Sequence, residues 1–358
     1  MKIAQIAPLT ESVPPRLYGG TERAVSYITE ALHELGHDVT LFASGDSVTQ
    51  AKLEAVWPRA LRLDASIRDF VAPHMLMLEK VRSRAAEFDI LHFHMDYYTF
   101  PLFSRQQTPF VTTMHGRLDL PEQQPVFDTF NDVPVVSISN AQRLPLPHAN
   151  WLRTIYHGLP ENLYSPRAIA PGYLAFIGRI SPEKRVDLAI SIAAHCRMKI
   201  RIAAKVDAAD SVYFESTIRP LLALPHVEYV GEISDREKAD FLSGAHALLF
   251  PIDWPEPFGL VMIEAMACGT PVIAFNRGAV SEVIDEGVTG FVVEDEIGAV
   301  AAVNRLHLLS RAGVRRRFEE RFSSKRMALE YVDLYTQMIR ARRRAKLKVI
   351  DAQSMSRP

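Results

Sequence analysis

The sequence predicts an α/β protein built from two doubly wound parallel sheets, one in each of two domains. Short apolar runs that suit buried strands alternate with longer segments of helical periodicity along most of the chain. The alternation stops once, in a proline-containing segment, and then starts again. The apolar runs are continuous, which is typical of strands covered by helices on both faces. We therefore expect domains at 1–160 and 170–322, with a linker at 161–169.

The first half begins with a strand, a glycine-containing turn and a helix. In this helix apolar residues recur at helical spacing, Thr21 stands where an N-cap is expected and Gly36 ends the segment. Asn140 is expected to cap a later helix. The predicted strands are Lys2–Ala7, His37–Ala43, Asp89–Phe93, Pro109–Met114, Val133–Ser139 and Leu152–Tyr156, and the predicted helices are Thr21–Leu35 and Asp69–Ala86.

The second half repeats the pattern. Pro182 suits a first helical turn, with Ser181 as its N-cap. The predicted strands are Tyr173–Ile177, Lys199–Ala204, Val227–Val230, Ala247–Phe250, a run ending at Ala274, and Gly290–Val293. The predicted helices are Pro182–His195, Asp210–Leu222, Asp235–Ser243, one that begins near Phe258, Val280–Asp285, Ile297–Leu309, Val314–Arg321 and Lys325–Arg343.

Composition narrows the class of protein. The chain has 358 residues, 48% of them hydrophobic, and a formal net charge of −1. This composition supports large cores, and the charge offers no general attraction to nucleic acid or membrane. Cys196 and Cys268 lie in apolar helical patterns and are expected to be buried thiols in a reducing compartment. No signal-peptide pattern and no apolar run of about 18 residues is found, so we expect a cytoplasmic protein.

Two carboxylates mark a candidate ligand site. Glu256 lies in a proline-bounded loop, and Glu264 lies eight positions later, in a helix that is otherwise apolar from Phe258 to Met266. A carboxylate in such surroundings is costly unless it is paired or bound to something. The loop follows a predicted strand end, and ligands bind outside the carboxyl ends of parallel strands. In two such domains, these strand ends would line a cleft.

Two cations follow another strand end. Arg179 comes after the strand that begins at Tyr173, and Lys184 lies five residues later. They would flank a helix N-terminus, which is a natural phosphate site; a solvated charged turn is the alternative. Gly19 and Gly20 permit close approach of the backbone to a ligand, or form a tight turn alone. The dinucleotide-binding glycine fingerprint is not found in the chain.

Three histidines also stand near strand ends. His92 and His94 share one face of a strand, and His115 follows the next strand. His115 is either a substrate contact or a structural residue. The spacing of His92 and His94 resembles that of metal ligands, but zinc sites usually need three or four ligands with a second shell. Neither a larger His/Cys cluster nor an Asp-x-Asp signature accompanies the pair. We therefore expect no metal site.

The C-terminal helices are basic. Two interpretations are open: a solvated helix face with a frayed tail, or a surface for weak peripheral contact with anionic lipid or an anionic acceptor, at the inner face of the membrane. The residues concerned are Arg311, Arg315, Arg316, Arg317, Arg321, Lys325, Arg326, Arg340, Arg342, Arg343, Arg344, Lys346 and Lys348.

These patterns together resemble the retaining glycosyltransferases of family 4, which have the GT-B fold of two Rossmann-like domains facing across a cleft. The resemblance covers nearly the whole chain. Its most specific part is the Glu-x7-Glu motif from Glu256 to Glu264, followed by Ala-Met-Ala-Cys-Gly-Thr-Pro. Weaker matches occur in the expected order, at Tyr18-Gly-Gly-Thr-Glu22, Thr113-Met-His-Gly116 and Gly178-Arg-Ile-Ser-Pro-Glu-Lys184. His157-Gly158 departs from the Asn-Gly of many relatives.

The resemblance implies transfer of a hexose from a nucleoside-diphosphate sugar, with UDP-glucose favoured and GDP-mannose next. Arg179 and Lys184 would stabilise the departing diphosphate, Glu256 would face the sugar, and His115 would complete the catalytic set. Glu264 would bind the ribose. No metal or other cofactor is implied. The chain from about 325 to 358 would cross back to complete the first domain, the acceptor side.

Further donor contacts follow from the same resemblance. Those in the first domain are Gly19 and Gly20, and those in the second are Gly231, Glu232, Ile233, Ser234, Phe258, Gly259, Leu260 and Val261. The acceptor would be a glycan, a lipid-linked molecule or a small molecule. Two alternatives stay open: a GT-B phosphorylase or epimerase, and a sugar-nucleotide-binding protein without catalysis.

Overall fold

The computed structural model describes residues 1–16, 19–164, 166 and 172–355, with side chains described as far as residue 344. The chain forms two compact units. The first contains Met1–Ile138, Pro145–Tyr156 and the chain from Ser324 onward, and the second contains Ser139–Leu144 and His157–Ser323. Segments 139–144 and 157–160, which the sequence assigned to the first domain, thus belong to the second unit. The expected linker 161–169 lies partly outside the described residues.

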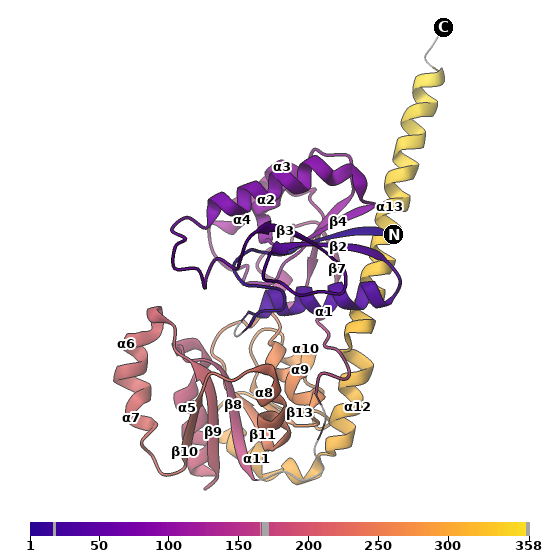
Figure 1. Ribbon diagram of the computed structural model, residues 1–358. Coiled ribbons are helices and arrows are strands. Elements are labelled where there is room, and N and C mark those ends of the chain that lie inside the picture. The colour runs from indigo at the N-terminus through magenta and orange to yellow at the C-terminus, as the bar shows by residue number, and fades with distance from the viewer. Residues whose placement is uncertain (17–18, 165, 167–171, 356–358) are drawn as a thin grey trace. The chain divides into compact units, whose positions relative to one another are not determined.

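The first unit is built on a seven-stranded parallel sheet with the order β3-β2-β1-β4-β5-β6-β7 (Figure 1). Most of its strands are buried, as the continuous apolar runs predicted. The strands are β1 Lys2–Ile6, β2 Asp38–Ser44, β3 Lys52–Trp57, β4 Ile90–Phe93, β5 Phe110–Thr113, β6 Val135–Ser137 and β7 Trp151–Thr154. The α-helices are α1 Gly20–Glu34, α2 Val71–Arg84, α3 Phe100–Phe103, α4 Gln123–Thr129 and α13 Ser324–Met355.

Two expectations for this unit were wrong, and so was one for residue 140, which belongs to the second unit. Strand β3 was not predicted, because it is an edge strand whose side chains are all partly or fully exposed and which therefore lacks an apolar run. Thr21 does not cap α1, since the helix begins one residue earlier and Gly19 takes the N-cap position. The side chain of Asn140 makes no cap bond; instead its backbone N–H donates to the carboxylate of Glu282 at 2.7 Å.

Helix α13 is the last element of the chain, yet it belongs to the first unit, where it packs against α1 (Figure 1). Its tyrosines Tyr331 and Tyr335 are one turn apart and almost fully buried. The guanidinium of Arg326 donates to the carbonyl of Tyr156 at 2.6 Å, and Arg153 pairs with Asp333 at 2.8 Å. The amphipathic pattern of the helix therefore serves to complete this unit.

The second unit has a six-stranded parallel sheet with the order β10-β9-β8-β11-β12-β13. The predicted class, an α/β protein with two doubly wound sheets, is thereby confirmed. The strands are β8 Tyr173–Arg179, β9 Lys199–Lys205, β10 Val227–Gly231, β11 Ala245–Phe250, β12 Val272–Phe275 and β13 Gly290–Val293. The α-helices are α5 Val186–His195, α6 Ser211–Tyr213, α7 Arg219–Leu221, α8 Asp235–Ser243, α9 Leu260–Ala267, α10 Val280–Val283, α11 Glu296–Asn304 and α12 Arg311–Arg321.

The segment after β8 differs from the single helix that was expected at Pro182–His195. Pro182–Lys184 forms a 3-10 turn, Arg185 adopts the left-handed conformation with φ 52°, and α5 begins only at Val186. Ser181 is extended, and its side chain makes no cap bond. A left-handed residue cannot continue an α-helix, so the break lies at Arg185. Lys184 therefore lies on a separate turn in front of the helix.

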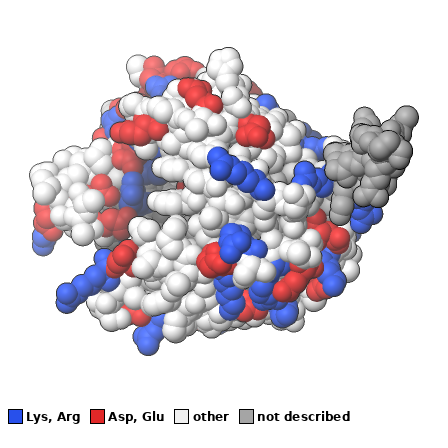
Figure 2. Space-filling view, turned by 90° about the horizontal axis from the view of Figure 1, so that it is seen from above, with Lys and Arg blue, Asp and Glu red and all other residues white. Residues whose placement is uncertain are grey.

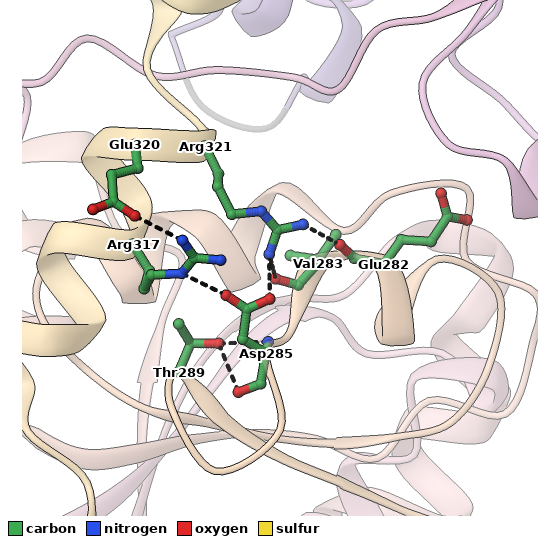
Figure 3. Close-up of polar contacts among 7 residues, drawn as sticks. All are labelled: Glu282, Val283, Asp285, Thr289, Arg317, Glu320 and Arg321. Carbon is green, nitrogen blue, oxygen red and sulfur yellow. Dashed lines mark hydrogen bonds and ion pairs between the residues drawn. The ribbon is translucent and has the colours of Figure 1, made fainter.

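Helix α12 is fastened to the rest of the second unit by arginines (Figure 3). Asp285 accepts from Arg317 at 2.7 Å and from Arg321 at 2.6 Å, and Arg321 also donates to the carbonyl of Glu282 at 2.7 Å. Arg311 donates to the carbonyls of Ala245 and Ser243. These arginines hold the unit together, so neither interpretation of the basic C-terminal sequence describes them.

Fewer basic residues form an exposed charged surface on the last helix than the sequence suggested. Arg340, Arg342, Arg343 and Arg344 are all exposed, and Arg342 also donates to the side chain of Gln107 at 2.6 Å. The side chains of Lys346 and Lys348 lie outside the described residues. On the face shown in Figure 2, basic and acidic side chains are interspersed. Within the described residues, no helix has both the length and the apolarity of a membrane span.

Candidate active site

The loop that carries Glu256 is held by backbone contacts. Its N–H donates to the carbonyl of Trp254 at 2.8 Å, and its own carbonyl accepts from Ala279 at 2.9 Å. Gly278 is at φ 57°, and a Cβ there would lie 2.3 Å from the carbonyl oxygen of Glu256. Only glycine combines that conformation with that approach. The sequence analysis did not predict a role for Gly278. Its position shortly after the predicted strand that ends at Ala274 was the signal that could have indicated one.

Lys184 and Glu256 form an ion pair, although they lie 72 positions apart. Their side chains are only 15% and 13% exposed. The same carboxylate accepts from the indole N–H of Trp254 at 2.9 Å, and the ammonium lies 5.0 Å from the Trp254 ring centroid. Two of the predicted catalytic residues are thus brought together. A carboxylate and an aromatic face orient the ammonium. An ammonium fixed in this way is suited to bind a phosphate.

Arg179 is the last residue of β8, rather than the residue after the strand. Its guanidinium pairs with Glu183, lies 3.4 Å from Asp210 and lies 3.7 Å from Asp207. Both aspartates follow the end of the neighbouring strand β9, and sequence reasoning missed them. Three carboxylates therefore hold this guanidinium at the carboxyl edge of the sheet, the edge where ligands bind in such folds.

The N-terminus of α9 follows the Glu256 loop. Gly259 stands at the N-cap with φ 82°, and Leu260 and Val261 in the first turn are partly exposed, whereas Met262 onward is buried. Backbone N–H groups at such a terminus attract anions. Phe258 precedes the helix and is 2% exposed, with its ring 5.0 Å from that of His157. Its side chain belongs to the core, so a donor contact there would involve its backbone.

Glu264 lies on the buried part of α9 and is 3% exposed. Its carboxylate accepts from the ammonium of Lys238 at 2.9 Å, and Lys238 also lies 3.6 Å from Asp235. Lys238 is on helix α8 and was missed, because its spacing gives no hint of a partner on another helix. Both charges of the pair are largely buried, so losing either one would leave the other charge in the interior poorly compensated.

The turn from Gly231 to Ser234 connects β10 with helix α8. Gly231 ends the strand at φ 77°, Glu232 and Ile233 form the loop, and Ser234 is the N-cap of the helix. The backbone N–H of Ser234 donates to Glu237 at 2.9 Å, which closes a capping box. Ser234 therefore shapes the turn. The turn leads directly into the helix that carries Lys238, the partner of Glu264.

Gly19, Gly20 and His115 belong to the first unit. Gly19 is buried, and a Cβ there would lie 2.8 Å from the Cβ of Pro15, so close packing requires glycine. Gly20 is the first residue of α1 and is exposed. Tyr18, which precedes them in the motif, lies outside the described residues.

His115 follows β5 and is bonded to a second histidine. Its Nε2 lies 2.9 Å from Nδ1 of His94, and the Nε2 of His94 lies 2.8 Å from the amide oxygen of Gln5. Burial lowers the pKa of His115 to about 3, so the ring is neutral at physiological pH. Among the described residues, no group of three or more His, Cys, Asp or Glu side chains is arranged to hold a metal ion.

Asp96 lies beside His115 and leads to a prediction about stability. Its carboxylate accepts from the backbone N–H of His115, and burial raises its pKa to about 6 from the ordinary 3.8. The folded protein thus holds this proton more tightly than the unfolded chain does. The protonated Asp96 carboxyl therefore contributes its full stabilisation of the folded state below about pH 4. This stabilisation is lost as the pH rises through about 6.

Asp96→Asn should therefore be more stable than the wild type at pH 7–8, by up to about 3 kcal/mol, with the difference vanishing near pH 4. Asparagine can accept the same N–H and tolerates the observed φ of 49°. Urea unfolding at a series of pH values measures the difference. The exposed Asp38→Asn is the control and should not reproduce the trend. An Asp96→Asn difference that is independent of pH would contradict the burial argument.

Comparison with known proteins gives two family matches. Residues 18–174 match the model described as Glycosyltransferase Family 4, and residues 168–323 match the model described as Glycosyl transferases group 1. The chain is 24% identical to N-acetyl-alpha-D-glucosaminyl L-malate synthase of Bacillus anthracis, over 92% of this chain and 97% of the relative. It is 25% identical to phosphatidyl-myo-inositol mannosyltransferase of Mycolicibacterium smegmatis, over 85% and 84% of the two chains.

Solved structures show the same fold. Sucrose-phosphate synthase from Thermosynechococcus elongatus superposes with a TM-score of 0.79 at 20% identity, covering 95% of this chain and 100% of that one. HepE of Anabaena, in complex with UDP and glucose, has a TM-score of 0.72 at 19% identity, covering 94% and 100%. The two family matches overlap at 168–174 and together take in most of the sequence. The chain is therefore a GT4-type glycosyltransferase with the GT-B fold, its first half matching Glycosyltransferase Family 4 and its second half Glycosyl transferases group 1.

Proposed function

We propose that this glycosyltransferase moves a hexose from a nucleoside-diphosphate sugar to an acceptor hydroxyl, with retention of anomeric configuration and without a metal ion. UDP-glucose is the favoured donor and GDP-mannose the next. A solved relative that contains UDP and glucose supports the first choice, and a relative named as a mannosyltransferase supports the second. The acceptor is a glycan, a lipid-linked molecule or a small molecule.

The observation that carries the proposal is the Lys184–Glu256 pair beside the N-terminus of α9. Loss of a nucleoside diphosphate leaves negative charge on the leaving phosphate. A fixed ammonium, a guanidinium at Arg179 and helix N–H groups stabilise that charge without a change of geometry. This electrostatic stabilisation takes the place that a divalent cation holds in other phosphate sites.

The ion pair also bears on the role of Glu256. The ammonium of Lys184 and the indole of Trp254 both donate to Oε2 of Glu256, and these two bonds draw charge from the carboxylate and make it a weaker nucleophile. We therefore assign Glu256 to the hydroxyls of the transferred sugar, with the acceptor attacking from the leaving-group side. Glu264 lies on the rigid helix α9 and is held there by Lys238 of helix α8. We assign Glu264 to the ribose hydroxyls.

A panel of sugar nucleotides tests the proposal by thermal shift and by release of nucleoside diphosphate. We expect selective stabilisation by UDP-glucose, worth about 3–4 kcal/mol at 100–1,000 times Kd, and slow donor hydrolysis that a suitable acceptor accelerates. Addition of EDTA should change neither the stabilisation by UDP-glucose nor the rate of hydrolysis. NMR of the product should show the anomeric configuration of the donor. Stabilisation without any turnover would favour a binding protein. A lack of stabilisation by every sugar nucleotide would reject the proposal.

A further inference from the structure

A continuous chain of buried hydrogen bonds leads from His115 to the last helix of the first unit. Beyond His94 and Gln5, the amide nitrogen of Gln5 lies 3.3 Å from the hydroxyl of Tyr335, and that hydroxyl lies 2.6 Å from Nδ1 of His92. His92 in turn bonds to Thr113 at 2.7 Å, and Thr113 bonds to Tyr331 at 2.7 Å. All members except His115 are at most 4% exposed.

The part of this hydrogen-bond chain from Gln5 through His94 to His115 allows two proton arrangements, because each neutral histidine carries one N–H and one lone pair. In one arrangement the donors point from His115 toward Gln5, and in the other they point the opposite way. Turning the amide of Gln5 over and exchanging the tautomers of His94 and His115 converts one arrangement into the other. The orientation of the Gln5 amide therefore decides the tautomer of His115.

The side-chain amide of Gln5 makes that choice. Its nitrogen faces the hydroxyl of Tyr335 at 3.3 Å, and its oxygen faces Nε2 of His94 at 2.8 Å. An amide nitrogen donates and an amide oxygen accepts, so the hydroxyl of Tyr335 accepts from Gln5 and can give its own proton to His92, 2.6 Å away. The amide oxygen of Gln5 then faces His94, which donates from Nε2 and accepts at Nδ1. His115 is left with its proton on Nε2, donated to His94.

We propose that Tyr335, Gln5 and His94 are positioning residues that hold His115 as its Nε2–H tautomer, with Nδ1 as an acceptor. The ring is then fixed in orientation and offers a lone pair, so it suits a hydroxyl that donates to it. That this hydroxyl belongs to the transferred sugar rests on the proposed function. The lowered pKa values of His92 and His115, which burial causes, keep the chain neutral. Helix α13 thereby sets the hydrogen-bonding polarity of a residue more than two hundred positions earlier.

NMR of the full chain with ¹⁵N-labelled histidine tests the tautomer directly. The signals of His115 are those lost in His115→Gln. We expect a protonated Nε2 and an unprotonated Nδ1 in the wild type, whether or not the protein turns over any sugar nucleotide. A protonated Nδ1 would overturn the proposal, and this measurement needs no destabilising variant. If no sugar nucleotide is bound or turned over, the proposed function fails while the tautomer result still stands.

Tyr335→Phe keeps the ring but removes the hydroxyl that orients Gln5. We expect the signals of His94 and His115 to shift toward a mixture of tautomers, and kcat to fall about tenfold with nucleoside-diphosphate affinity unchanged. The matched control is Tyr173→Phe, which removes one buried hydroxyl hydrogen bond of 2.6 Å in the second unit. It should leave the tautomers and kcat as in the wild type. Unaltered His115 signals in Tyr335→Phe would overturn the proposal.

Discussion

Replacing Lys184 by methionine should lower kcat for sugar transfer about 10²–10³-fold, in line with the loss of a single preorganised charge-stabilising donor. Methionine has an unbranched apolar side chain of similar length, so the change removes mainly the ammonium, which lies 5.0 Å from the Trp254 ring centroid. The ammonium acts on charge that develops as the diphosphate departs. We therefore expect kcat and kcat/KM to fall together, measured as release of nucleoside diphosphate under saturating acceptor.

Glu256→Gln is the matched comparison for this pair. It removes the other charge of the ion pair and leaves the ammonium available to a diphosphate. Affinity for the free nucleoside diphosphate should hold or rise, while turnover of the sugar nucleotide falls because the sugar contact is weakened. Lys184→Met should lower both quantities. Wild-type kcat in Lys184→Met, in a protein that unfolds cooperatively, would remove Lys184 from the catalytic set.

Glu264→Ala is expected to have the second large effect, on both binding and stability. Affinity for nucleoside diphosphates should fall about 10–100-fold, because hydrogen bonds to a charged group contribute about 1.5–3 kcal/mol. The free energy of unfolding should fall by up to about 3–5 kcal/mol, because the largely buried ammonium of Lys238 loses its nearer carboxylate and keeps only the more distant Asp235, at 3.6 Å. Calorimetry with UDP and GDP measures the first quantity, and urea unfolding measures the second.

A double variant separates the two effects. Glu264→Leu combined with Lys238→Met removes both charges at similar volume, and replacing a whole buried pair by apolar residues costs little or stabilises. We expect its stability to return close to that of the wild type, while nucleotide affinity stays low. If the double variant bound UDP as tightly as the wild type, Glu264 would be a structural residue and its assignment to the ribose would be wrong.

Most strands and helices were predictable because they follow local periodicity. Helix α8 and strand β13 have the predicted bounds, and the alternation of elements gave the correct number of sheets. Strand β3 was missed because an edge strand that water reaches on both faces carries no apolar run. The break at Arg185 was missed because proline at a first turn is equally compatible with a 3-10 turn and with the start of an α-helix.

The candidate site was predictable in part. Glu256 and Glu264 were found because two carboxylates in apolar surroundings are conspicuous in a sequence. Their partners were not identified as such, since Lys184 lies on a turn 72 positions before Glu256 and Lys238 lies on a different helix from Glu264. The aspartates around Arg179 were also missed, because they follow a neighbouring strand and only the strand order brings them together.

The sequence by itself determined the fold class and the burial of Glu264, because both depend on the spacing of residue types within one or two neighbouring elements. Only the tertiary structure decided which charges pair and which residues join the buried histidines in one series of hydrogen bonds. Tyr335 meets Gln5 across 330 positions, a contact created when α13 packs against the sheet of the first unit. Hydrogen-bond direction depends on which of these remote groups face one another, and local periodicity does not report such contacts.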